Sequence, residues 1–219
     1  MHNSQNMVDY VKRIDKFMSH TVENAVKNKI LGHGRGWCFT VKHFLGIGSN
    51  ISIRKALSDL QHVKLIRRIS QGLYDYPRVH KTLGIIPPNI EAVAKAVAEK
   101  NGAKIQPAGA YAANLIGISE QVPGKVVFLT DGPPKKLRIG NLEIIFKQAT
   151  VKSMFASGSK EALVVQALKF IGKNNIDQSA IQAAKKFLHG SNRKEFERNL
   201  QFAPQWVRQI LFETMKEIL

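Results

Sequence analysis

The chain has 219 residues, of which 44% are hydrophobic, and this composition excludes a wholly disordered protein. Its 33 Lys and Arg outnumber its 16 Asp and Glu, giving a formal net charge of +17 that favours an anionic partner. No apolar stretch reaches the roughly 18–20 residues of a membrane span, and the single cysteine, Cys38, excludes an intrachain disulfide. Because the first residues also lack an apolar signal core, we expect a cytoplasmic protein without a membrane partner.

The beginning of the chain predicts helices that lead into a short strand. Apolar residues at spacings of three and four over residues 4–30 indicate helical segments, and the glycines within 32–36 end this pattern. A strand at Trp37–Thr40 then leads to a short helix near Val41–Leu45 and a glycine-rich turn.

Residues 35–78 follow the element order of a winged helix-turn-helix. A second helix near Ile51–Gln61 precedes two strands, Leu65–Ile69 and Leu73–Tyr76, whose turn contains Gly72. In this motif the second helix enters the major groove of DNA and the hairpin, or wing, touches the backbone. We therefore expect residues 1–78 to be a DNA-binding domain with a helical N-terminal extension.

The candidate DNA contacts lie on the second helix, around the first helix and on the wing. Helical spacing puts Arg54, Lys55 and Ser58 opposite the apolar face of the second helix. Arg67 and Arg68 are adjacent in a strand, so we expect one to reach phosphate and the other to pair with an acidic group or lie along the scaffold. An ordinary solvated surface of a basic protein is the alternative. The full set of expected contacts is Thr40, Lys42, Ser49, Asn50, Ser52, Arg54, Lys55, Ser58, Arg67, Arg68 and Gln71.

The pattern changes after a proline-containing linker, which we place at residues 79–89. Residues 90–150 predict a mixed α/β segment: a helix at Ile90–Lys100, a strand at Lys104–Gln106, a helix beginning at Pro107, and later strands around a Gly140-Asn141 turn. From residue 159 onward the chain predicts four helices. The expected fold class is thus α+β, with an N-terminal winged helix-turn-helix, a mixed α/β segment and a C-terminal helical region; residues 90–219 form one effector domain.

Catalytic and cofactor motifs are missing from the sequence. The histidines have no metal-ligand spacing with Cys38 or carboxylates, and there is no phosphate-binding glycine loop, so we expect neither metal nor cofactor. Cys38 lies in an apolar run and is expected to be a buried, inert thiol. Asp131, Glu143 and Lys147 are the remaining candidates, since two carboxylates and a lysine could bind a metal and cut phosphodiesters.

Several stretches together resemble the AbiEi-like antitoxins, the transcriptional-regulator half of type IV toxin–antitoxin systems linked to abortive infection. The resemblance covers about residues 20–150. It is carried by GWCFT at 36–40, RKALSDL at 54–60, IRRISQGLYDYP at 66–77, PAG at 107–109, NLIGIS at 114–119, QVP at 121–123 and LTDG at 129–132.

The resemblance implies a winged helix that represses its own operon by binding operator repeats in double-stranded DNA. It also implies a C-terminal domain that counteracts a nucleotidyltransferase toxin, directly or functionally, and no enzymatic activity of its own. A stand-alone winged-helix transcription factor and a metal-dependent nuclease remain the alternatives.

Overall fold

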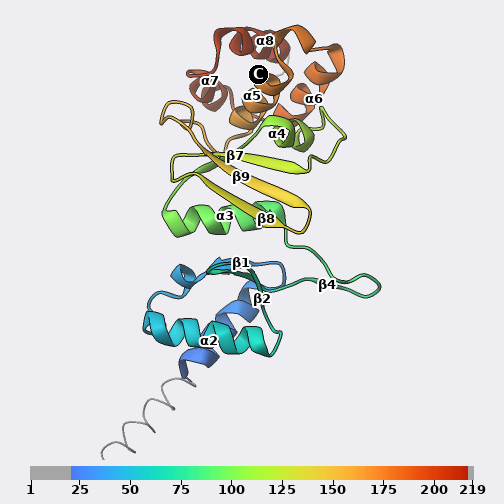
Figure 1. Cartoon of the computed structure of the whole chain (residues 1–219). Coiled ribbons are helices and arrows are strands. Elements are labelled where there is room, and N and C mark those ends of the chain that lie inside the picture. Colours follow the sequence, from blue (N-terminus) through green and yellow to red (C-terminus); the bar gives the residue numbers. More distant parts are fainter. Residues whose placement is uncertain (1–20, 217–219) are drawn as a thin grey trace, which may run out of the picture. The chain divides into compact units, whose positions relative to one another are not determined.

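The structure is a computed structural model that describes residues 21–216. The chain divides into two compact units between Lys100 and Asn101 (Figure 1). Both units combine helices and sheet, so the expected α+β class is confirmed. Of the helix expected at residues 4–30, residues 4–20 lie outside the described part, and residues 21–33 are helical.

The first unit has the element order expected of a winged helix-turn-helix. After the helical residues 21–33 come β1 (Cys38–Thr40), a single 3-10 turn η1 (Val41–Phe44), α2 (Asn50–His62), β2 (Arg67–Ser70) and β3 (Leu73–Asp75). The three strands form an antiparallel sheet in the order β1-β3-β2. The first helix of the motif is thus shorter and tighter than the expected α-helix. The core of this unit contains Val26, Ile30, Phe39, Phe44, Ile53, Ala56, Leu57, Leu60, Ile66 and Tyr76.

The turn between η1 and α2 depends on two glycines. Gly46 has a φ of +89°, in the left-handed region that side chains with a Cβ avoid. A Cβ on Gly48 would lie 2.9 Å from Cγ2 of Val22, so glycine is needed for the close approach of this turn to the preceding helix. These contacts hold α2 at a defined position against residues 21–33.

Residues 79–89, expected to be an extended linker, contain a small hairpin instead. It consists of β4 (Val79–His80) and β5 (Gly84–Ile85), and it stands away from α2 in Figure 1. The helix α3 (Ile90–Asn101) follows and belongs almost entirely to the first unit. The boundary between compact units therefore lies about a helix length after the one expected from the prolines.

The second unit begins with a four-stranded mixed sheet. Its strands are β6 (Ile105–Ala108), β7 (Lys125–Thr130), β8 (Lys135–Ile139) and β9 (Leu142–Gln148), in the order β6-β7-β9-β8. Only β7 and β9 pair in parallel. The helix expected to start at Pro107 starts two residues later, as α4 (Gly109–Leu115). Pro107 lies within β6, an edge strand, where the missing N–H of proline is tolerated.

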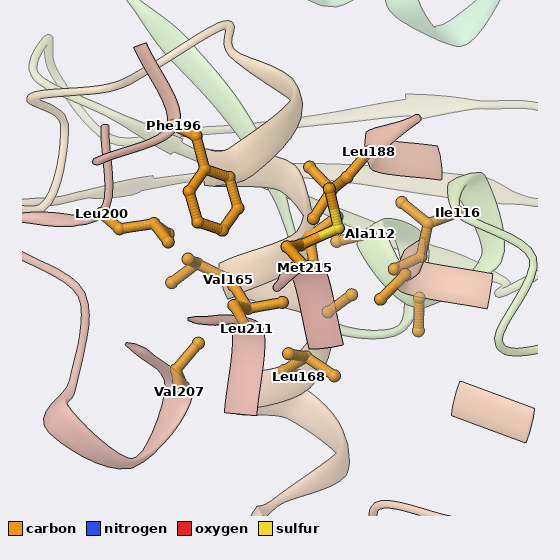
Figure 2. Close-up of a cluster of buried hydrophobic side chains, with 14 residues drawn as sticks. Ala112, Ile116, Val165, Leu168, Leu188, Phe196, Leu200, Val207, Leu211 and Met215 are labelled. Atoms are coloured by element: carbon orange, nitrogen blue, oxygen red, sulfur yellow. The ribbon is translucent and has the colours of Figure 1, made fainter. Parts of the chain in front are cut away.

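The remaining helices build a second core. They are α5 (Lys160–Ile171), the 3-10 turn η2 (Lys173–Asn175), α6 (Gln178–Leu188), α7 (Arg193–Leu200) and α8 (Gln205–Met215). Side chains from these α-helices and from α4 converge in one apolar cluster (Figure 2). The N-caps of α5, α6 and α7 are Ser159, Asp177 and Asn192, whose side chains accept hydrogen bonds from the first turn. The expected C-terminal helical region is thus confirmed. Within residues 21–216, no helix is long and apolar enough to cross a membrane.

Candidate nucleic-acid interface

One face of α2 is built to be exposed. Four apolar residues of the helix are buried: Ile53, Ala56, Leu57 and Leu60. The opposite face presents Arg54, Lys55 and Ser58, all exposed as the spacing predicted. Ile51 lies on the same face with 82% of its surface exposed, although an isoleucine gains free energy by burial. This face therefore combines two cations, a hydroxyl and an apolar side chain.

The start of α2 uses one predicted contact residue for capping. The hydroxyl of Ser49 accepts a hydrogen bond from the backbone N–H of Ser52 at 3.1 Å, and the two hydroxyl oxygens lie 2.8 Å apart. Asn50, the first residue of the helix, is exposed. Ser49 and Ser52 thus order the first turn, and Asn50 presents its amide at the end of the exposed face.

Thr40 is wrongly placed among the expected DNA contacts. It is only 2% exposed, and its N–H donates to Nδ1 of His43 at 3.0 Å. The opposite ring nitrogen of His43, Nε2, lies 2.8 Å from the Glu99 carboxylate in α3. The threonine therefore caps η1 and cannot reach a phosphate, whereas Lys42, two residues on, is exposed.

Arg67 is also wrongly placed, because its guanidinium is committed to a buried carboxylate. Its Nε donates to Oδ1 of Asp75 at 3.0 Å and its Nη2 to Oδ2 at 2.6 Å. Nη2 also lies 3.2 Å from the carbonyl oxygen of Ile86. Asp75 is 1% exposed, so this bidentate ion pair is a buried structural contact between β2 and β3.

Arg68 and Gln71 are the wing residues that remain available. Both are exposed, and among residues 21–216 Arg68 has only a long contact, from Nε to the carbonyl oxygen of Ser70 at 3.4 Å. Gly72 completes the turn with a φ of +69°. Of the two adjacent arginines, Arg67 thus pairs with an acidic group and Arg68 points to solvent.

The charge of the described part of the first unit is strongly positive. Residues 21–100 contain thirteen Lys and Arg but only five Asp and Glu. Two of these five acids, Asp75 and Glu99, already have partners in Arg67 and His43. Asp59 lies one turn beyond Lys55 on α2, but the excess of thirteen cations over five acids leaves this unit strongly positive, which suits a polyanion.

A protein-family model matches residues 25–196, which include α2, the wing and most of the second unit. The chain belongs to the DUF6088 family. That family is described as one of unknown function. No curated protein matches the sequence. Among solved structures, the crystal structure of the RV2827C protein from Mycobacterium tuberculosis is similar, with 14% identity and a TM-score of 0.42 over 91% of this chain and 76% of that one.

The single cysteine of this DUF6088 chain is shielded. Cys38 is 3% exposed, and burial, followed by the charge of Asp75, raises the pKa of its thiol to about 12. A thiol with that pKa is almost fully protonated near pH 7 and is a poor nucleophile. Cys38 is thus a core residue of the sheet.

The sheet of the second unit separates the carboxylates considered for a metal site in the DUF6088 chain. Glu143 is in register with Lys125, six residues before Asp131 on the neighbouring parallel strand, so the two acids are roughly 20 Å apart. Oδ1 of Asp131 accepts from the N–H of Lys104 at 2.7 Å, which explains its place in the turn. Within residues 21–216, no cluster of three or more His, Cys, Asp or Glu could hold a metal.

Two features of the DUF6088 chain were missed in the sequence. The exposure of Ile51 could have been found from the same helical spacing that placed Arg54 and Ser58, since residues 51, 54, 55 and 58 share a face. The β4–β5 hairpin gave a weaker signal, because its strands have two residues each and Gly84 was interpreted as part of a linker.

Proposed function

We propose that this protein is a cytoplasmic DNA-binding transcriptional repressor that also acts as the antitoxin of a type IV toxin–antitoxin system, counteracting a nucleotidyltransferase toxin. The observation that carries the DNA-binding part is the exposed face of α2, where Arg54, Lys55 and Ser58 project from a helix held by its apolar side. In winged helix-turn-helix proteins the helix at this position reads the major groove.

The side chains on this face suit base recognition. Arginine and lysine donate to O6 and N7 of guanine, and serine can donate or accept at any base edge. The exposed Ile51 offers an apolar contact to the methyl group of thymine. Lys42, Arg68 and Gln71 are then the phosphate contacts, which set the position of the helix without reading sequence.

The antitoxin part rests on the motif resemblance described above and on the division into two units, which allows separate functions. The C-terminal unit would protect against the toxin, and the N-terminal unit would control expression of the pair. The alternative hypothesis is a repressor without a toxin partner. The two hypotheses differ in whether the protein protects a cell from a nucleotidyltransferase toxin.

DNA binding is tested with the full-length chain and duplexes from the region upstream of its own gene. Arg54→Ala should weaken binding by about 1–3 kcal/mol and relax specificity at one base pair, because a bidentate base contact is lost. The matched control is Arg198→Ala, an exposed arginine on α7 in the other unit, which should leave binding unchanged. Failure of the full chain to prefer any duplex over random DNA contradicts the proposal.

Antitoxicity is tested by co-expression with a nucleotidyltransferase encoded beside the gene. The full chain should restore growth, and an Arg54→Ala/Lys55→Ala variant that has lost operator binding should restore it equally well. Loss of protection in that variant would mean that the two units act together. No protection by the unaltered chain would leave the transcription factor alone as the function.

A further inference from the structure

The hairpin of residues 78–86, called the arm here, exposes apolar side chains that no described residue of its own unit covers. Val79 is 55% exposed, Ile85 is 60% exposed, and Leu83 at the tip is 75% exposed. Hairpin tips are normally polar, and an isolated two-stranded hairpin is marginally stable in water. An apolar tip on so small a hairpin indicates that a partner molecule covers these side chains.

The arm is nevertheless ordered in a defined way. At its base, Ile86 donates its N–H to the carbonyl of Arg78 at 3.0 Å, and the Ile86 carbonyl accepts from Arg67 at 3.2 Å. At its tip, Nδ1 of His80 accepts from the N–H groups of Thr82 and Leu83, each at 3.3 Å. Leu83 is therefore held at the end of the arm by the histidine ring.

The charge of the arm identifies the kind of partner. Arg78, His80 and Lys81 are all exposed, and residues 76–90 contain no Asp or Glu. Two copies of this arm placed against each other would bring like charges together in a symmetric contact, which is unfavourable. Duplex DNA suits both features, because its phosphates attract the cations of the arm and its stacked bases offer an apolar contact to Leu83.

We propose that the arm inserts into the minor groove of duplex DNA, with Leu83 as an apolar wedge against a base step and Lys81 on the flanking phosphates. Apolar wedges flanked by cations are how minor-groove proteins unstack and bend DNA. The extended residues from Arg78 to the tip span about 10 Å, enough to reach the floor of a groove about 7.5 Å deep. This inference rests on the proposed DNA binding and adds a second contact to that of α2.

The arm follows β3 after only two residues, and Arg67, which pairs with Asp75 in the sheet, also donates to the Ile86 carbonyl at the base of the arm. A contact made by the arm is thus connected to the unit that carries α2 and the wing. Insertion at a pyrimidine–purine step such as TA would add sequence preference beyond the bases read in the major groove, because such steps are easily kinked and unstacked.

The test uses the full-length chain, an operator duplex and fluorescence anisotropy. Leu83→Ser and, separately, Lys81→Ala should each weaken binding about tenfold, whereas Leu83→Met should retain it. Val122→Ser, which removes another apolar side chain that is 81% exposed, is the matched control and should change nothing. Netropsin, which occupies the minor groove, should weaken binding of the unaltered chain but not weaken the Leu83→Ser variant further.

Three results separate the possibilities. If the unaltered chain binds, Arg54→Ala weakens it and both arm variants match the control, the arm proposal is overturned while the DNA-binding function stands. If Leu83→Ser lowers the mass of the DNA-free protein in solution, the arm joins two copies of the chain, and the proposal is again overturned. If the unaltered chain binds no duplex, the proposed function itself fails, and the arm proposal fails with it.

Discussion

Replacing Arg67 by methionine should destabilise the first unit far more than replacing its neighbour. The substitution keeps much of the side-chain volume but removes the two donors that hold Asp75 at 3.0 Å and 2.6 Å. Asp75 is 1% exposed and would be left as a buried carboxylate without a cation. The arginine itself is a structural part of the sheet, so its loss is a folding defect first.

The magnitude follows from the burial of the two partners. Breaking a buried ion pair by removing one side costs about 3–5 kcal/mol. The side chain of Arg67 is 33% exposed, so water can replace part of the lost interaction, and we take the lower end, about 3 kcal/mol. For a unit of this size that corresponds to a fall in Tm of roughly 12–24 °C.

Cys38 provides an assay that reports on this unit alone. It is the only cysteine, it is 3% exposed, and its β-strand pairs with the strand that holds Asp75. Labelling by a thiol reagent across a urea series therefore measures unfolding around the ion pair, independently of the second unit. Arg68→Met is the matched control, and its effect should be below about 0.5 kcal/mol because the side chain is exposed.

A double variant decides whether the ion pair is the cause. Arg67→Met/Asp75→Asn removes the unpaired charge, so it should be more stable than the sum of the two single changes predicts, by about 1 kcal/mol or more. Equal midpoints for Arg67→Met and Arg68→Met, or simple additivity in the double variant, would refute the reasoning.

The other predictions concern the wing, the end of α2 and the second unit. Arg68→Ala should reduce the slope of log binding constant against log salt concentration by about 0.9, whereas Arg67→Met, if folded, should leave this slope unchanged. Equal slopes for Arg68→Ala and the unaltered chain would show that the wing does not contact DNA. Lys64→Gly should raise the free energy of unfolding of the first unit by about 0.5–1 kcal/mol in urea, since Lys64 has a φ of +59°, and a lower free energy of unfolding would contradict this. Burial raises the pKa of Glu161, but hydrogen bonds from Asn199, its own backbone and Ser191 outweigh it and hold the pKa below its usual range. The second unit should therefore lose stability as the pH falls below about 4, and Glu161→Gln should reduce this loss in acid unfolding, followed by the fluorescence of Trp206 in a Trp37→Phe background.

The element order was predictable because local patterns determine it. Apolar spacing located α2 and the C-terminal helices, and Ser159 marked a helix start because its hydroxyl caps the first turn. The exposed face of α2 was predictable for the same reason: Arg54 and Ser58 cannot share a side of the helix with Ile53 and Leu57.

Only the tertiary structure decided which polar side chains are available to a partner. Alternation along a strand shows that Arg67 and Arg68 face opposite sides, but which one pairs depends on Asp75, eight residues away on the neighbouring strand. Thr40 was expected at the surface, yet it is buried by contacts with His43 and the packing of η1. The arm was hidden because strands of two residues are too short to show a period in the sequence. Helical and strand periods are properties of short segments of chain, whereas burial and pairing are set by segments that meet only in the folded protein.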